Sequence, residues 1–150
     1  MKIFFAGDHA GFEMKGKLID FVRGLGYEVE DLGPLRYDPT DDYPDFVIPL
    51  ARKVALDGAH QVRGIVVAGS GQGEIIAMNR VSGARAALFC PCNLDLIKAS
   101  RDHNDSNIFA IGARFCTLEE AKKGIQIWLE IPFSNDERHV RRLAKIDNSS

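Results

Sequence analysis

The chain has 150 residues, with 19 Lys and Arg against 21 Asp and Glu and a formal net charge of −2. Hydrophobic residues make up 45% of it and charged residues 27%, which excludes disordered and fibrous proteins and predicts one globular domain over residues 1–150. The near-zero charge argues against a protein that coats nucleic acid. No apolar run reaches the roughly 18 residues of a membrane span, and the short apolar start does not resemble a signal peptide. We therefore expect a cytoplasmic protein with no membrane partner.

The three cysteines are an odd number, which argues against a disulfide framework. Cys90 and Cys92 are two positions apart, and Cys116 stands alone. A zinc site would need two well-spaced pairs or additional histidines, and neither is visible in the sequence. We therefore expect no metal, and free thiols that are buried or half-buried.

Short apolar runs alternate with longer stretches in which apolar residues recur at helical spacing. Residues 27–32 alternate apolar and acidic side chains, as in a strand near a sheet edge, whereas residues 64–68 are continuously apolar, as in a strand buried on both faces. Thr117 and Glu120 have the spacing of a capping box. The predicted strands are 2–6, 27–32, 64–68, 84–89 and 108–111, and the predicted helices are 12–25, 46–56, 74–80, 93–101 and 117–129, followed by a basic helical tail over about 136–150.

Strand–helix alternation repeated about five times implies parallel strands with helices on both faces. We therefore predict an α/β fold, a three-layer α/β/α arrangement around a five-stranded parallel, Rossmann-like sheet. In such folds ligands bind beyond the carboxyl ends of the strands, at a topological switch point. The residues that directly follow each strand are therefore the first candidates for a functional site.

The first strand is followed by Asp8 and His9, which lie between two glycines at the start of a helix. In the structural interpretation, Asp8 caps the helix and His9 is an ordinary surface residue. In the functional interpretation, an acid and an imidazole stand at the carboxyl end of a strand, where a ligand binds. The residues alone leave both interpretations open.

The strand over 64–68 is followed by Gly69-Ser70-Gly71-Gln72-Gly73-Glu74. Alternate glycines let the backbone approach a ligand closely, and the N–H groups of such a loop form an anion site. The pattern is neither a P-loop nor the dinucleotide fingerprint. Glu74 is either an acid stabilised in the first helical turn or a general base beside donors that could hold a developing oxyanion.

Further polar clusters lie at residues 101–105, 112–114 and 138–142. Arg138 and Arg142 are four positions apart, so they share one helical face. That face is either a solvated charged surface or a clamp in which planar guanidinium groups bind a phosphate. Together with the two loops, these clusters fit a small anionic substrate and proton-transfer chemistry.

Seven segments together resemble a family of sugar-phosphate isomerases, the one that contains ribose-5-phosphate isomerase B and the galactose-6-phosphate isomerase subunits. They follow the family's order and extend over nearly the whole chain, so chance similarity is very improbable. The matching segments are 7–12, 42–45, 69–74, 79–85, 101–105, 112–114 and 138–142.

The resemblance implies a cofactor-free aldose–ketose isomerisation of a pentose phosphate in the pentose phosphate pathway. It also implies a homodimer or homotetramer with active sites at the subunit interface. One subgroup of the family uses a cysteine base just before the glycine loop, where this chain has Ala68, and the other places a glutamate directly after the loop, as Glu74 is placed here. The chain is therefore assigned to the glutamate subgroup, and its cysteines should be dispensable for catalysis.

By the same resemblance, Glu74 would move a proton between C1 and C2 through a cis-enediolate, whose oxygen is held by N–H groups of the glycine loop. Asp8 and His103 would orient hydroxyls and assist ring opening, and His103 and Arg114 are candidates to come from a partner subunit. The implied catalytic residues are Glu74, His103, Asp8 and Ser70; the implied substrate-binding residues are His9, Tyr43, Gly69, Gly71, Gly73, Asn104, Arg114, Arg138 and Arg142, with His9 and the three arginines on the phosphate.

Two alternatives stay open. Within the enzyme class, the substrate could be galactose 6-phosphate, allose 6-phosphate or a tetrose phosphate, because the sequence does not give the depth of the pocket. In a different class, the chain could be a non-catalytic sugar-phosphate sensor. Glu74 distinguishes the two classes, because a sensor has no need of a base beside an anion site.

Overall fold

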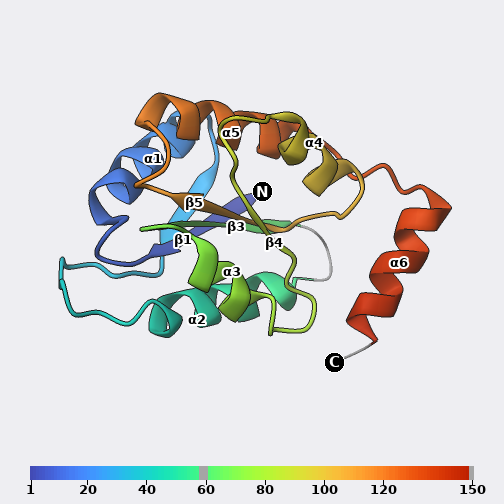
Figure 1. The fold of residues 1–150 in the computed structure, drawn as a ribbon, viewed down its shortest axis with the longest axis horizontal. Helices are drawn as coiled ribbons and strands as arrows, with labels where there is room; N and C mark the ends of the chain where they lie inside the picture. Colours follow the sequence, from blue (N-terminus) through green and yellow to red (C-terminus); the bar gives the residue numbers. More distant parts are fainter. Residues whose placement is uncertain (58–60, 149–150) are drawn as a thin grey trace.

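The computed structural model describes residues 1–57 and 61–148 (Figure 1). Within them, five strands form one parallel sheet in the order β2-β1-β3-β5-β4. This confirms the predicted sheet, with the residues around 28–31 at one edge and the continuous apolar strand near the centre. The strands are β1 (Lys2–Gly7), β2 (Glu28–Asp31), β3 (Val62–Ala68), β4 (Ala86–Leu88) and β5 (Ile108–Gly112).

Helices cover both faces of the sheet, which confirms the three-layer arrangement (Figure 1). One face carries α1, α4 and α5 and the other carries α2 and α3, whereas α6 lies beyond the amino ends of the strands, next to the start of β4. None of the helices in the described part of the chain has both the length and the apolarity to cross a bilayer. The helices are α1 (Phe12–Gly24), α2 (Pro44–Ala55), α3 (Gln72–Met78), α4 (Asp95–Asp102), α5 (Leu118–Glu130) and α6 (Glu137–Asp147).

Alternate side chains of each central strand enter two separate cores. Ile3 and Phe5 pack with α1, α4 and α5, whereas Phe4 and Ala6 pack with α2 and α3. Each large side chain buried in this way contributes roughly 1.5–3 kcal/mol relative to its exposed state. Burial on both faces explains why the central strands are continuously apolar in sequence.

The order in which successive strands are added to the sheet reverses at β1: β2 pairs with one side of β1, and β3 pairs with the other. The loops that follow β1 and β3 therefore leave the same edge of the sheet and diverge to opposite faces, which creates a crevice between them. Gly7 at the end of β1 is in register with Val67 of β3, so the segments after them begin side by side. The fold thus places two of the predicted motifs at its switch point.

The start of α5 shows how local sequence sets a helix boundary. The Glu120 backbone N–H donates to Thr117 Oγ1 at 3.2 Å, and the Thr117 backbone N–H donates to Glu120 Oε2 at 2.7 Å. Both bonds satisfy N–H groups that have no acceptor within the helix. The predicted capping box is confirmed.

Candidate active site

The glycine loop connects β3 to α3 where the carboxyl ends of the strands lie, which we call the carboxyl edge of the sheet. Gly71 caps α3 with φ of +78°, a left-handed conformation that side chains with a Cβ rarely adopt. Gly73 has Tyr43 against it: a Cβ added there would lie 2.6 Å from the Tyr43 hydroxyl oxygen. Glycine at these two positions therefore gives the turn its shape and lets the predicted pocket residue Tyr43 lie over the loop.

Glu74 is the third residue of α3 and is only 4% exposed. Burial, with a further contribution from the Asp8 carboxylate, raises the pKa of Glu74 above its ordinary value. A solvated acid stabilised by the helix terminus would shift the other way. Burial therefore favours the functional interpretation, in which Glu74 is a base with a higher pKa than a solvated glutamate.

Asp8 follows β1 and is 8% exposed. Its Oδ1 accepts a hydrogen bond from the Gly11 N–H at 3.0 Å, which fixes the start of α1. The structural interpretation of Asp8 is thus met in part, because the side chain does close the helix start. The same carboxylate acts on the pKa of Glu74, so the loops after β1 and β3 form one electrostatic unit.

His9 is held by Asp41, a residue that the sequence analysis did not single out. His9 Nδ1 lies 2.6 Å from Asp41 Oδ1, and the His9 backbone N–H donates to the same oxygen at 3.2 Å. The hydrogen bond to Asp41 raises the pKa of His9, which favours the cationic imidazole that an anion would need. The only sequence signal was that Asp41 directly precedes the matching segment 42–45.

Arg114 joins the same edge from the end of β5. Its backbone N–H donates to the Gly69 carbonyl at 3.2 Å, and its Nη1 lies beside Gly69. Arg114 therefore lies beside the glycine loop of its own chain. Ser70 is exposed beside it, and Ser70 Oγ accepts from the Gln72 N–H at 3.3 Å.

A second group of predicted residues lies on the opposite side of the sheet, where the amino ends of the strands lie, which we call the amino edge. His103 and Asn104 follow α4, which runs back from the carboxyl edge, and both are exposed. The His103 ring stacks on His139 of α6 with centroids 4.5 Å apart, and α6 also carries the exposed Arg138 and Arg142. One chain thus divides the predicted site residues between two edges that cannot meet within it.

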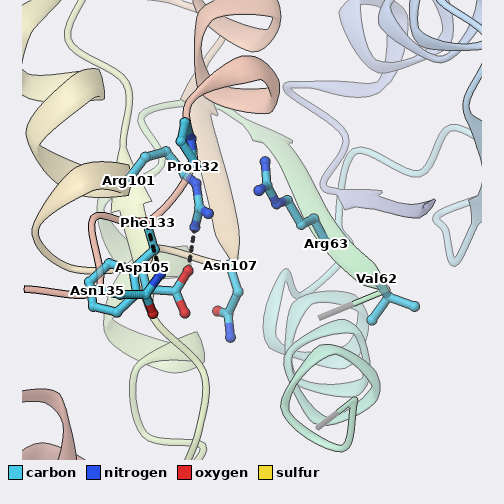
Figure 2. A pocket seen from close by; sticks show the side chains of 8 residues that line it. All are labelled: Val62, Arg63, Arg101, Asp105, Asn107, Pro132, Phe133 and Asn135. Carbon is cyan, nitrogen blue, oxygen red and sulfur yellow. Dashed lines mark hydrogen bonds and ion pairs between the residues drawn. The ribbon is translucent and has the colours of Figure 1, made fainter. Parts of the chain in front are cut away.

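The amino edge also contains a cavity of about 300 Å³ that includes Arg63, Arg101 and Asp105 (Figure 2). Arg101 Nη1 donates to Asp105 Oδ1 at 2.9 Å and to the Ser106 carbonyl at 2.6 Å. Arg63 Nη1 donates to two carbonyls at the end of α5, and burial together with Arg101 lowers its pKa to about 10. These guanidinium groups are engaged in holding α5 and the segment before β5 in place.

The thiols depart in one respect from expectation. Cys90 and Cys116 are half-buried as predicted, but Cys92 is exposed because it lies in the turn that follows β4. Burial raises the pKa of Cys116 to about 11. Cys90 and Cys92 have their Sγ atoms 3.0 Å apart.

The fold and the carboxyl-edge cluster define a class. The chain matches the profile of the Ribose/Galactose Isomerase family over residues 3–146. It therefore belongs to this isomerase family, and the resemblance found in the sequence is confirmed.

Individual proteins similar to this chain are named ribose-5-phosphate isomerase B. Ribose-5-phosphate isomerase B of Mycobacterium tuberculosis is 39% identical over 143 residues, which are 95% of this chain and 86% of the relative. The solved ribose-5-phosphate isomerase B of Mycoplasma genitalium with bound ribulose-5-phosphate has a TM-score of 0.91 at 34% identity, with 99% of this chain and 95% of that chain covered. The Clostridium thermocellum ribose-5-phosphate isomerase B has a TM-score of 0.90 at 40% identity, with 99% and 97% covered.

Proposed function

We propose that this chain is an aldose–ketose isomerase that interconverts ribose 5-phosphate and ribulose 5-phosphate, a reaction of the pentose phosphate pathway in the cytoplasm. The carrying observation is Glu74, a buried carboxylate with a raised pKa that directly follows a glycine loop at the switch point. The names of the relatives and the ribulose-5-phosphate in one related structure support the substrate class. Residues 1–150 would act as one isomerase domain with α6 as its basic tail.

In the proposed reaction, Glu74 removes a proton from one of the carbons C1 and C2 and returns it to the other. A C–H group beside a carbonyl is a very weak acid, so the base needs a fixed position and the developing oxyanion needs stabilisation. N–H groups in the first turn of α3 have no acceptor within the helix, and together with Gly71 they would hold the enediolate oxygen. Asp8 would orient a substrate hydroxyl beside Glu74. In this mechanism the negative charge of the enediolate is carried by backbone dipoles, so the reaction needs no cofactor.

The phosphate would be bound by residues from both edges of the sheet. His9 and Arg114 stand beside the glycine loop, whereas Arg138 and Arg142 stand exposed on α6 at the other edge. A site that uses all four must therefore take the arginines of α6 from a second copy, along with His103 and Asn104. This supports a homodimer, or a homotetramer built from such dimers, with active sites between subunits.

Subunit exchange tests this division. Glu74→Gln inactivates one edge and the double variant Arg138→Ala/Arg142→Ala inactivates the other. Random exchange makes about half of the dimers mixed, and each mixed dimer has one intact site of two, so about a quarter of wild-type activity should return. Activity that stays at the level of the two parent proteins after verified exchange would place each site within a single chain.

A coupled assay for ribulose 5-phosphate formed from ribose 5-phosphate tests the activity itself. The same assay with galactose 6-phosphate, allose 6-phosphate and a tetrose phosphate ranks the substrates by kcat/KM. We expect ribose 5-phosphate to rank first. Tight binding of a sugar phosphate without turnover of any of them would favour the sensor interpretation instead.

A further inference from the structure

The turn after β4 brings two thiols together. In Cys90-Pro91-Cys92 the two Sγ atoms lie 3.0 Å apart, closer than an ordinary contact between sulfur atoms. Cys92 is exposed and Cys90 is half-buried, so solvent-borne reagents can reach the pair. The isomerase mechanism uses neither thiol.

This turn faces the glycine loop across a small cavity, and the strand before the turn contacts the loop directly. Pro91 lines a cavity of about 140 Å³ together with Ser70 and Gln72 of that loop. Leu88, at the end of β4, lies so close to Gly71 that a Cβ added at Gly71 would be 2.5 Å from Leu88 Cδ1. Tightly packed contacts transmit small displacements, so a movement of the turn that shifts Leu88 also shifts the glycine loop that would hold the enediolate.

We propose that Cys90 and Cys92 are an oxidative modification site, at which a peroxide closes an intrachain disulfide that displaces the neighbouring glycine loop and lowers activity. The disulfide requires the sulfur atoms to approach from 3.0 Å to about 2.05 Å. Pro91 stands between the two cysteines and must follow that movement. The effect on activity rests on the proposed isomerase function, whereas the formation of the bond does not.

The chemistry is a two-electron oxidation. The exposed Cys92 sulfur attacks the peroxide, the O–O bond breaks, and sulfenic acid and one water form from hydrogen peroxide. The Cys90 sulfur then attacks the Cys92 sulfur, forming the S–S bond and releasing the sulfenic oxygen as a second water with the Cys90 proton. Two thiols and one peroxide thus give one disulfide and two waters. A dithiol reductant reverses the step by thiol–disulfide exchange.

Cys116 provides the matched control. It lines the same cavity as Pro91, but burial raises its pKa to about 11, which keeps it protonated and unreactive. The hydrogen bond that the Cys92 thiol shares with Cys90 also raises the pKa of Cys92, so this pair reacts because of its proximity and exposure rather than through a strongly activated thiolate. We therefore compare Cys116→Ser with Cys92→Ser.

The first readout is covalent. Reduced full-length protein is treated with hydrogen peroxide near stoichiometry and analysed by intact mass and peptide mapping. Wild type and Cys116→Ser should each lose two hydrogen masses within the peptide that contains residues 90 and 92, and dithiothreitol should restore them. A bond that involves Cys116, a bond between two molecules, or no bond at all while over-oxidised cysteine accumulates would overturn the proposal.

The second readout is kinetic. Oxidised wild type and Cys116→Ser should lose about tenfold or more in kcat/KM, because misplacement by about 1 Å can cost on the order of 10²-fold. Dithiothreitol should reverse the loss, and Cys92→Ser should not show it. Unchanged kinetics in fully disulfide-bonded protein would overturn the coupling to the loop. If the reduced protein turns over no sugar phosphate, the proposed function has failed, and binding of ribulose 5-phosphate before and after oxidation becomes the readout.

Discussion

The two edges of the sheet both gather charged side chains, but they use them differently. At the carboxyl edge, Glu74 and Asp8 are buried as two neighbouring acids beside a glycine loop, an arrangement that raises a pKa instead of neutralising a charge. At the amino edge, Arg63 and Arg101 give their N–H groups to carbonyls and to Asp105. A cavity lined by arginines is therefore a weaker guide to chemistry than an acid kept in an unfavourable setting.

The amino edge itself contains two kinds of arginine. Arg101 is 4% exposed and bonded on several sides, whereas Arg138 and Arg142 project from α6 into solvent. An exposed arginine keeps its hydration and can exchange a loose surface ion pair, such as that of Arg138 with Asp136 at 3.8 Å, for a phosphate, whereas a buried arginine already forms hydrogen bonds that stabilise the fold. Substitutions at the two kinds of position should therefore separate binding from stability.

The largest effect is expected from the exposed pair. The double variant Arg138→Ala/Arg142→Ala should lose on the order of 10²–10⁴-fold in kcat/KM, since each charge-assisted contact contributes about 1.5–3 kcal/mol. Most of the loss should appear in KM, because the phosphate does not react, with some loss of kcat because remote binding also positions the reacting carbons. Steady-state kinetics with ribose 5-phosphate measures both.

Inorganic phosphate supplies the control for that variant. It should compete with substrate in wild type and much more weakly in the double variant, while the melting temperature changes little because surface substitutions usually stay within about 0.5 kcal/mol. If KM and phosphate inhibition are both unchanged, α6 is ordinary charged surface, and the phosphate is left to His9, Arg114 and the glycine loop.

The carboxyl edge is tested by Glu74→Gln, which keeps the shape of the side chain but removes the carboxylate. We expect kcat to fall by about 10²-fold or more with little change in KM, as for loss of a general base. In wild type, kcat/KM should fall as the pH drops through the raised pKa of Glu74, at a pH above the ordinary glutamate value. Activity within a few-fold of wild type would remove Glu74 from the mechanism.

The same variant tests how far the buried carboxylate of Glu74 lowers the stability of the folded protein. Because the folded-state pKa of Glu74 lies above its unfolded value, the folded protein binds the proton more tightly, and stability falls as the pH rises through that window. Glu74→Gln lacks this loss, so it should unfold at a higher temperature than wild type at neutral pH and differ less in acid. Equal or lower stability of the variant at neutral pH would mean that folding does not raise the pKa of Glu74.

Much of the fold could be predicted because its signals are local. The apolar runs of the central strands, the helical spacing of apolar residues and the capping box at Thr117 each depend on residues close in sequence. The glycine loop could likewise be located from the sequence, because its alternate glycines lie close together in the chain. The edge position of β2 followed from its alternating acidic residues.

The rest depends on contacts between distant segments, which local patterns do not encode. The bond between Asp41 and His9 spans 32 positions, and the approach of Tyr43 to Gly73 depends on how α2 packs beneath the sheet. The exposure of Cys92 follows from the path of the turn after β4. The division of the site residues between the two edges also became visible only when α4 and α6 were placed.

A smaller effect, on stability alone, is expected from the buried arginine. Arg101→Met keeps the length of the side chain but leaves the Ser106 and Ile131 carbonyls without this donor. The variant should lose about 1–3 kcal/mol in unfolding free energy, as for buried acceptors left unsatisfied, while Asp105 keeps its bond to Arg85. Chemical denaturation measures the loss, and KM for ribose 5-phosphate should stay unchanged. A raised KM without a loss of stability would mean that Arg101 binds substrate and does not stabilise the fold.

The smallest effect concerns Asp41, which tunes His9 from outside the glycine loop. Asp41→Asn keeps an oxygen that can accept from the His9 backbone N–H but removes the charge, so the pKa of His9 should return toward its ordinary value of 6.5. Well below pH 6.5 both proteins carry a cationic His9, and their KM values should agree.

As the pH rises above 6.5, the variant loses the imidazolium first, because wild type keeps its proton up to the raised pKa. KM should then be about two- to tenfold higher in the variant, the size of one hydrogen bond to the phosphate, while kcat stays close to wild type. The ratio should close again once wild-type His9 has also lost its proton. His9→Gln is the matched control, since it carries no charge at any pH and its KM should lack this pH dependence. A ratio that is constant across the range would mean that Asp41 only shapes the loop.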